Sequence, residues 1–252
     1  MNLKKFFSEF GFEPVVNNPI LYRLKNENVF SKIFFGLSRI TGRAPFMMFK
    51  NSFFPEVNPR IVEMPFVFQN LPKGEKLKIL DFGCSESLLP IQMATLGYDV
   101  HGADLQEYPF KHINFTFHHG NFLDNKFKAG TFDIVTAISS VEHSGLGSYE
   151  SPKFSGGDIK ILQEIKRVMK KDGVLILTVP FGQKYKDGFQ RVYDNEALIH
   201  FIKGFKIVLR KHYIRKNKRQ MWVEATINEA EKKKYVGINE PEGVVCLILT
   251  KS

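Results

Sequence analysis

The stretch that decides the fold runs from Leu77 to Asp104 and reads LKILDFGCSESLLPIQMATLGYDVHGAD. Residues 77–82 form a short apolar run of strand length, residues 99–104 are predicted as a second strand, and residues 88–96 are predicted as a helix. Pro90 falls in the first helical turn, where its missing N–H is tolerated, and Gly97 follows as a stop signal. A strand, a helix and a second strand in close succession predict a parallel sheet.

The same alternation continues along the rest of the chain. Further strands are predicted at residues 114–118, 132–139, 174–179, 205–209 and 244–249. Between them we expect a helix capped by Asp158 and ended by Gly173, another from Asp194 to Gly204, and a third within residues 219–235. Strands that are apolar throughout are typical of parallel sheets covered on both faces. We therefore predict an α/β fold, a Rossmann-like, doubly wound, mostly parallel sheet with helices on both faces, over residues 76–252.

The segment before this alternation is different in character. Prolines recur through residues 1–75 and interrupt any long helix, although short helices near residues 28–40 and 59–70 are compatible with the pattern. We expect residues 1–75 to form a helical or irregular N-terminal cap or lid.

Composition narrows the class of protein. The chain has 252 residues, of which 43% are hydrophobic and 25% charged, which fits one soluble α/β domain with an appendage and excludes a disordered chain. Two cysteines provide neither a disulfide framework nor a zinc site, and no apolar stretch is long enough to span a bilayer. These features predict a cytoplasmic protein and leave a peripheral membrane contact and the oligomeric state open.

The net charge of +10 fits an anionic partner or a solvated lysine-rich surface, and residues 211–219 form its one dense basic run.

The residues that carry chemistry follow the predicted strands. Ligands of open α/β sheets bind outside the carboxyl ends of the strands. Asp104 ends the second strand, at the position where a carboxylate accepts hydrogen bonds from two ribose hydroxyls. A dinucleotide would also need the G-x-G-x-x-G loop, but Ser85 and Leu88 occupy its second and third glycine positions. Asp81 and Glu86 add negative charge there, which favours a nucleoside that carries a positive charge, such as S-adenosylmethionine.

At this point the sequence resembles the class I S-adenosylmethionine-dependent methyltransferases over residues 77–250. The matching stretches, in chain order, are residues 79–85, Asp104, Asn121-Phe122, residues 132–139 followed by 141–143, and residues 164–180. Ser85 and Ser87 replace two glycines of the first motif, and Asn121 replaces the usual aspartate near the adenine.

The resemblance implies a cofactor site in which Asp81 and the Gly83 main chain face the methionine part and Asn121 and Phe122 lie near the adenine. Cys84 is then a small apolar filler. The complete predicted cofactor set is Asp81, Gly83, Cys84, Ser85, Asp104, Leu105, Asn121, Phe122 and Ser139.

The methyl acceptor needs a base only if it must lose a proton. His143 is the predicted catalytic base. The alternative is a structural histidine that orients the loop or contacts the cofactor. The residues predicted to bind substrate are Glu142, Tyr149, Arg191 and Tyr193, and Arg60 and Glu63 are weaker candidates. For Arg191 a salt bridge that shapes the loop is the alternative to binding a carboxylate or phosphate.

We expect a methyltransferase that acts on a small-molecule or glycan-like acceptor, anionic acceptors included. The alternatives are a nucleic-acid methyltransferase that uses residues 211–219, and a degenerate member without catalysis. An NAD(P)-dependent oxidoreductase is disfavoured by the loop after the first strand.

Overall fold

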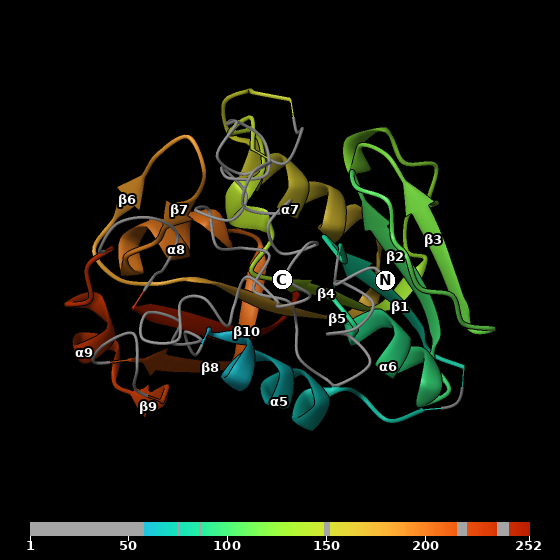
Figure 1. Cartoon of the computed structure of the whole chain (residues 1–252), viewed down its shortest axis with the longest axis horizontal. Coiled ribbons are helices and arrows are strands. Elements are labelled where there is room, and N and C mark those ends of the chain that lie inside the picture. The colour runs from blue at the N-terminus through green and yellow to red at the C-terminus, as the bar shows by residue number, and fades with distance from the viewer. Residues whose placement is uncertain (1–57, 75, 86, 149–151, 216–220, 236–241) are drawn as a thin grey trace, which may run out of the picture. The chain divides into compact units, whose positions relative to one another are not determined.

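The structure is a computed structural model that describes residues 58–74, 76–85, 87–148, 152–215, 221–235 and 242–252. Its centre is an eight-stranded sheet in the order β3-β2-β1-β4-β5-β10-β8-β9 (Figure 1). The strands are β1 (Lys78–Phe82), β2 (Asp99–Asp104), β3 (Phe115–His119), β4 (Phe132–Ile138), β5 (Met169–Pro180), β8 (Phe205–Ile214), β9 (Val223–Ala225) and β10 (Gly243–Lys251). A separate two-stranded sheet joins β6 (Tyr185–Lys186) to β7 (Arg191–Val192).

Strand direction confirms the predicted fold class. Strands β1 to β5 are parallel to one another, whereas β10 is antiparallel to both of its neighbours, β5 and β8. Strand β9 pairs antiparallel with β8 at the edge of the sheet.

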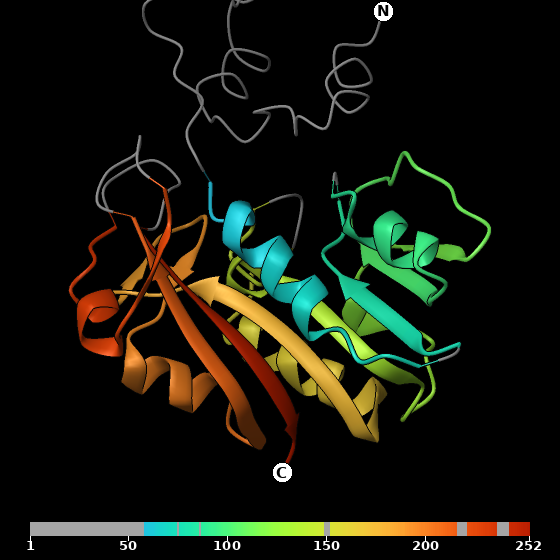
Figure 2. The same ribbon diagram turned by 90° about the horizontal axis from the view of Figure 1, so that it is seen from below.

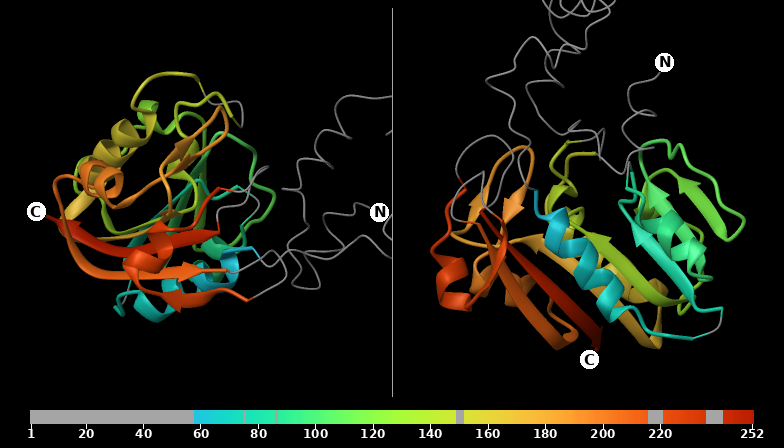
Figure 3. Two further views of the ribbon diagram at one scale, coloured as in Figure 1. Left: turned by 90° about the vertical axis from the view of Figure 1, so that its left-hand side faces the viewer. Right: turned by 60° about the horizontal axis from the view of Figure 1, so that its bottom comes forward.

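Helices cover both faces of this sheet. Helices α5 (Arg60–Asn70) and α6 (Leu89–Thr95) pack on one face, and α7 (Gly157–Val168) and α8 (Asn195–Phe201) on the other. The left view of Figure 3 shows helices on both sides of the sheet, and Figure 2 shows α5 lying across one face of it. Helix α5 contacts β10. Shorter elements are η1 (Phe122–Asp124), η2 (Val141–His143) and α9 (Ile227–Glu231).

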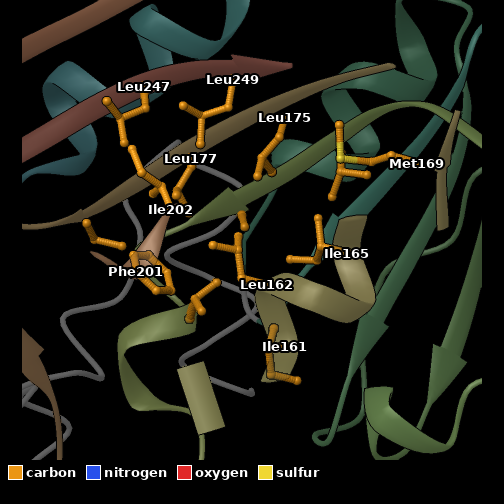
Figure 4. Close-up of a cluster of buried hydrophobic side chains, with 14 of the residues drawn as sticks. Ile161, Leu162, Ile165, Met169, Leu175, Leu177, Phe201, Ile202, Leu247 and Leu249 are labelled. Atoms are coloured by element: carbon orange, nitrogen blue, oxygen red, sulfur yellow. The ribbon is translucent and has the colours of Figure 1, made fainter. Parts of the chain in front are cut away.

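Two apolar cores hold these layers together. Figure 4 shows the core beneath α7 and α8, where Leu162 and Ile165 of α7 meet Leu175 and Leu177 of β5. On the opposite face, Phe66 and Val67 of α5 pack in one cluster with residues of α6, β1 and β10. Burial on both faces is why most buried positions of the central strands are apolar, with Asp81, Thr136 and Thr178 as buried polar exceptions.

Some predicted element boundaries are wrong. The N-cap of α7 is Gly156, with a φ of 67°, and not the predicted Asp158. Asp158 lies in the first turn of the helix, and its side chain pairs with Arg191. The helix ends at Val168, since β5 begins at the next residue and already contains Gly173. Residues 219–235 include β9 and α9 and no single long helix in their described part.

The predicted cap at Asp194 is confirmed, because its side chain accepts a hydrogen bond from the Ala197 N–H at 2.8 Å.

The predicted N-terminal segment is described from residue 58 onward. Its helix α5 matches the predicted helix at 59–70 and belongs to the compact unit of residues 58–236 and 240–252. The predicted helix at 28–40 lies outside the described residues, and the division of the chain at residue 75 stays a prediction. No helix among the described residues is long and apolar enough to cross a membrane.

Candidate functional site

The candidate site lies where the direction of the strand connections reverses. Strand β1 pairs with β2 on one side and with β4 on the other, so the connections that leave their carboxyl ends diverge. Such a divergence leaves a crevice at the edge of an open α/β sheet. Most of the predicted site residues lie at or directly after the carboxyl ends of β1, β2 and β4, which are neighbours in the sheet.

The turn after β1 requires glycine at one position. Gly83 has a φ of 73°, and a Cβ atom there would lie 2.5 Å from the Cβ of Ser140 after β4. The Gly83 N–H donates to the carbonyl of Ala103 in β2 at 2.9 Å. The turn therefore touches both neighbouring strands, and any larger side chain would force them apart.

Asp104 is held rigidly at the end of β2. Its Oδ2 accepts the N–H of Ser85 at 2.8 Å, and its Oδ1 accepts the N–H of Gln106 at the same distance. The Ser85 hydroxyl donates to the Gln106 side-chain oxygen at 3.1 Å, so Gln106 lies beside the predicted site residues, although no sequence motif indicates it. Desolvation by burial raises the pKa of Asp104, and the two N–H donors oppose this. The carboxylate is thus positioned to accept further donors.

Asp81 is a buried carboxyl group at the end of β1. The Thr136 hydroxyl of β4 donates to its Oδ1 at 2.6 Å. Desolvation raises the pKa of Asp81 to about 7, while Thr136 and Arg60 lower it in part. A carboxyl group whose burial makes ionisation costly becomes easier to ionise when a cation lies beside it.

Cys84 is buried, and desolvation raises its pKa well above the ordinary value. It is therefore a thiol and not a thiolate near neutral pH, which fits the predicted filler.

The residues after β3 are engaged in local contacts. Asn121 accepts the Leu123 N–H at 3.2 Å and donates to Asp124 at 2.9 Å, which caps η1. Phe122 is buried, with its ring 5.1 Å from that of Phe82 at the end of β1. Their predicted place beside an adenine stays a prediction, as does that of Leu105, whose carbonyl accepts from His119 at 2.8 Å.

Helix α5 reaches the same edge of the sheet from outside the strand–helix alternation. Glu63 is fully buried, and its Oε1 accepts the hydroxyls of Ser139 at 2.5 Å and Thr178 at 2.7 Å. Arg60 donates to the carbonyl of Ile138, the last residue of β4, at 2.8 Å. The sequence marked both α5 residues only as weak candidates, because no periodic pattern indicates which strand a separate helix will cover.

His143 lies in η2, directly after β4. Its Nδ1–H donates to the Phe189 carbonyl at 2.7 Å, an arrangement that leaves Nε2 as the basic nitrogen, 3.8 Å from Glu142 Oε1. Desolvation lowers the pKa of His143 to about 4 and raises that of Glu142 to about 8. Both groups are therefore neutral at pH 7, and Glu142 Oε2 is buried without a hydrogen-bond partner among the described residues.

Arg191 and Tyr193 are buried in the wall of the loop that follows β4. Arg191 donates to the carbonyls of Glu142 at 2.9 Å and Ser144 at 2.8 Å, and its Nε lies 3.3 Å from Asp158. The Tyr193 hydroxyl donates to the same Asp158 at 2.9 Å. These contacts fit the loop-shaping salt bridge that the sequence left open, while substrate binding by this pair stays a prediction.

Tyr149 and the basic run at residues 211–219 are also predicted functional features. Tyr149 lies outside the described residues, as do residues 216–219 of the basic run. In the described part of that run, Lys211 pairs with Glu224 at 2.9 Å, and His212 and Arg215 are buried. No group of three metal-ligating side chains occurs among the described residues.

The sequence matches one protein-family model. The family model DUF268, described as a Caenorhabditis protein of unknown function, matches residues 105–239, which is more than half of the chain. No curated protein matches the sequence.

Solved structures share the fold at low sequence identity. A Listeria monocytogenes protein, provisionally assigned as an S-adenosylmethionine dependent methyltransferase, is 13% identical with a TM-score of 0.52, over 75% of this chain and 98% of that one. The 1,6-didemethyltoxoflavin-N1-methyltransferase of Burkholderia thailandensis is 14% identical with a TM-score of 0.51, over 86% and 85% of the two chains. The predicted resemblance is confirmed at the level of the fold, which is that of the class I S-adenosylmethionine-dependent methyltransferases.

Proposed function

The chain belongs to the DUF268 family, and on that premise we propose that it is a methyltransferase that uses S-adenosylmethionine. The fold supports this proposal, and the Burkholderia structure of similar fold holds S-adenosylhomocysteine together with a small-molecule substrate. The observation that carries the proposal is the Asp104 carboxylate, fixed by the Ser85 N–H at the point where the strand connections diverge.

The residues present fit this cofactor. Asp104 would accept the two ribose hydroxyls, and its bonds to main-chain N–H groups fix the carboxylate in advance. Asp81 would balance the positive charge of the methionine part, since its carboxyl group is buried and has few other partners. Gly83 leaves room for close approach, with Cys84, Ser85, Leu105, Asn121, Phe122 and Ser139 completing the proposed set. Bound S-adenosylmethionine supplies a methyl group activated by its sulfonium.

His143 is the proposed base for an acceptor that must lose a proton. Its Nδ1–H is committed to the Phe189 carbonyl, so Nε2 would receive the proton of the acceptor. The lowered pKa keeps the ring neutral at pH 7, with Nε2 unprotonated, but it also makes this nitrogen a weaker base than that of an ordinary histidine. Positioning of the acceptor would supply much of the remaining acceleration.

The proposed acceptor is a small molecule or a glycan, anionic ones included. Arg60 is the proposed contact for an anionic acceptor, because it donates to the Ile138 carbonyl at the end of β4 and its side chain is 27% exposed. The buried part of residues 211–219 does not favour a nucleic-acid acceptor, because His212 and Arg215 present no charge to solvent.

Isothermal titration with S-adenosylmethionine and S-adenosylhomocysteine tests the proposal, with NADH as the control ligand. We expect micromolar binding of the first two and none of NADH. Asp104→Asn should weaken binding, whereas Asp172→Asn should not, because it removes the same charge from an exposed residue of β5. Absence of binding to the wild-type chain would favour the degenerate, non-catalytic reading.

The proposed base is tested by methyl transfer. A screen of glycans and acidic metabolites with a radiolabelled methyl group would identify an acceptor. His143→Gln should then lower kcat strongly and leave the Kd for the cofactor within about twofold. Full activity of this variant would remove His143 from the mechanism.

A further inference from the structure

The residue after β4 has an unusual main-chain conformation. Ser139 has a φ of 42°, and Lys76 is the one other non-glycine residue with a positive φ in the described ranges. Lys76 is exposed in a turn, whereas Ser139 follows the last residue of β4, at the proposed site. Left-handed conformations are unfavourable for residues with a side chain, so the surrounding structure must hold Ser139 in place.

The holding contacts converge on one carboxylate. The Ser139 N–H donates both to the Thr178 main-chain carbonyl at 3.1 Å and to the Thr178 hydroxyl oxygen at 3.0 Å. This hydroxyl donates its own hydrogen to Glu63 Oε1 at 2.7 Å. The Ser139 hydroxyl donates to the same Oε1 at 2.5 Å. Both the side chain and the main chain of Ser139 are therefore connected to Glu63, the side chain directly and the main chain through Thr178.

The consequence reaches the turn after β1. Ser140 follows Ser139 directly, and its hydroxyl donates to the Phe82 carbonyl at 3.1 Å. Its Cβ is also the atom that limits the space beside Gly83. A change in the Ser139 main chain would therefore displace the contact between the two turns that flank the proposed cofactor site.

We infer that Glu63 is a positioning residue, whose buried carboxylate holds Ser139 in the left-handed conformation that the proposed cofactor site requires. The inference rests on the proposed function. It assigns to α5 a role in cofactor binding, although α5 precedes the strand–helix alternation. Glu63 acts through Ser139 and needs no contact with the cofactor.

Recovery of cofactor affinity by a glycine at position 139 distinguishes this positioning role of Glu63 from a general contribution to stability. Glu63→Ala should weaken the affinity for S-adenosylhomocysteine about tenfold, because Ser139 is released to an ordinary conformation. Adding Ser139→Gly should recover most of that loss, since glycine adopts a positive φ without a side-chain penalty. Adding Ser139→Ala is the matched control: it also removes the hydroxyl, keeps the Cβ, and should recover nothing. Glu63→Gln, which retains an acceptor oxygen, should bind more tightly than Glu63→Ala.

The measurements are titration calorimetry for affinity and thermal unfolding for folding. Wild-type affinity in Glu63→Ala, or equal recovery by glycine and alanine, would overturn the inference and leave the proposed function intact. If the wild-type chain binds neither S-adenosylmethionine nor its product, the proposed function fails and the inference falls with it. If Glu63→Ala does not fold, single Ser139→Gly and Ser139→Ala variants decide: tighter binding by the glycine variant supports the inference, and equal affinities overturn it.

Discussion

Asp81 should make cofactor affinity depend on pH. Its pKa is about 7 because burial disfavours the charged form, and a cationic ligand should bind the ionised form. With this pKa, the ionised fraction is about 0.09 at pH 6 and about 0.91 at pH 8. The affinity for S-adenosylmethionine should therefore rise about tenfold over this range, through loss of the Asp81 proton.

The same linkage predicts proton release. At pH 7 about half of the Asp81 side chains carry a proton, so binding should release about 0.5 proton per ligand from this group. Titration calorimetry in two buffers with different ionisation enthalpies measures this number. Asp81→Asn is the matched variant, because its amide oxygen can still accept from Thr136.

The comparison between wild type and Asp81→Asn isolates the group. The amine of the free ligand titrates identically in both experiments, and Glu142, whose pKa is raised to about 8, is present in both proteins. If both proteins show the same pH dependence and the same proton release, Asp81 does not face the cationic part of the cofactor.

The stability of the unliganded protein should depend on pH in the opposite direction to the cofactor affinity. Because the folded pKa of Asp81 lies above its ordinary value, the folded state binds more protons between about pH 4 and pH 7. The contribution of Asp81 to the free energy of unfolding therefore falls as pH rises through that range. Asp81→Asn should remove this slope and unfold at a higher temperature than wild type at pH 8, while it binds cofactor less well.

Three further substitutions give defined outcomes. Asp104→Asn should weaken cofactor binding at least about tenfold in calorimetry, because the amide keeps one acceptor oxygen and loses the other together with the charge, and a hydrogen bond to a charged group contributes roughly 1.5–3 kcal/mol. Unchanged affinity would contradict the site. Gly83→Ala should lower the free energy of unfolding by about 1–3 kcal/mol in urea, since its Cβ would lie 2.5 Å from that of Ser140, and wild-type stability would show that the turn can move. Arg191→Met should cost about 3–5 kcal/mol of stability by leaving the charge of Asp158 buried without its cation. Wild-type stability with a raised KM for an identified acceptor would instead support substrate binding by Arg191.

The sequence was informative where local signals and tertiary packing agree. The β1–α6–β2 unit could be predicted because its apolar periods, Pro90 and Gly97 all indicate the same elements, and strands buried on both faces must be apolar. Asp194 caps its helix as predicted, and its side chain has no competing hydrogen-bond or ion-pair partner within the part of the chain that the structure describes. Asp158 is likewise an aspartate near the start of a helix, but its carboxylate binds Arg191 and Tyr193 and does not cap the helix.

The site was less predictable where it depends on contacts between distant segments. Glu63 lies 76 residues before Ser139, and no spacing rule connects them. Arg191 was a reasonable candidate for an anion clamp by residue type alone, but its burial depends on the path of the loop after β4. Gln106 has no motif of its own and enters through its main-chain contact with Asp104.

The placement of β10 has a consequence for the order of assembly. Strand β10 follows β8 and β9 in the sequence, yet it lies between β5 and β8 in the sheet. During synthesis, β1 to β5 can therefore associate as they emerge, whereas β8 and β9 have no sheet neighbour outside their own pair until β10 inserts. Long-range pairing of this kind is slow because the intervening loop must close first. We expect pulse-labelling hydrogen exchange to show β8 and β10 gaining protection together, after the parallel strands.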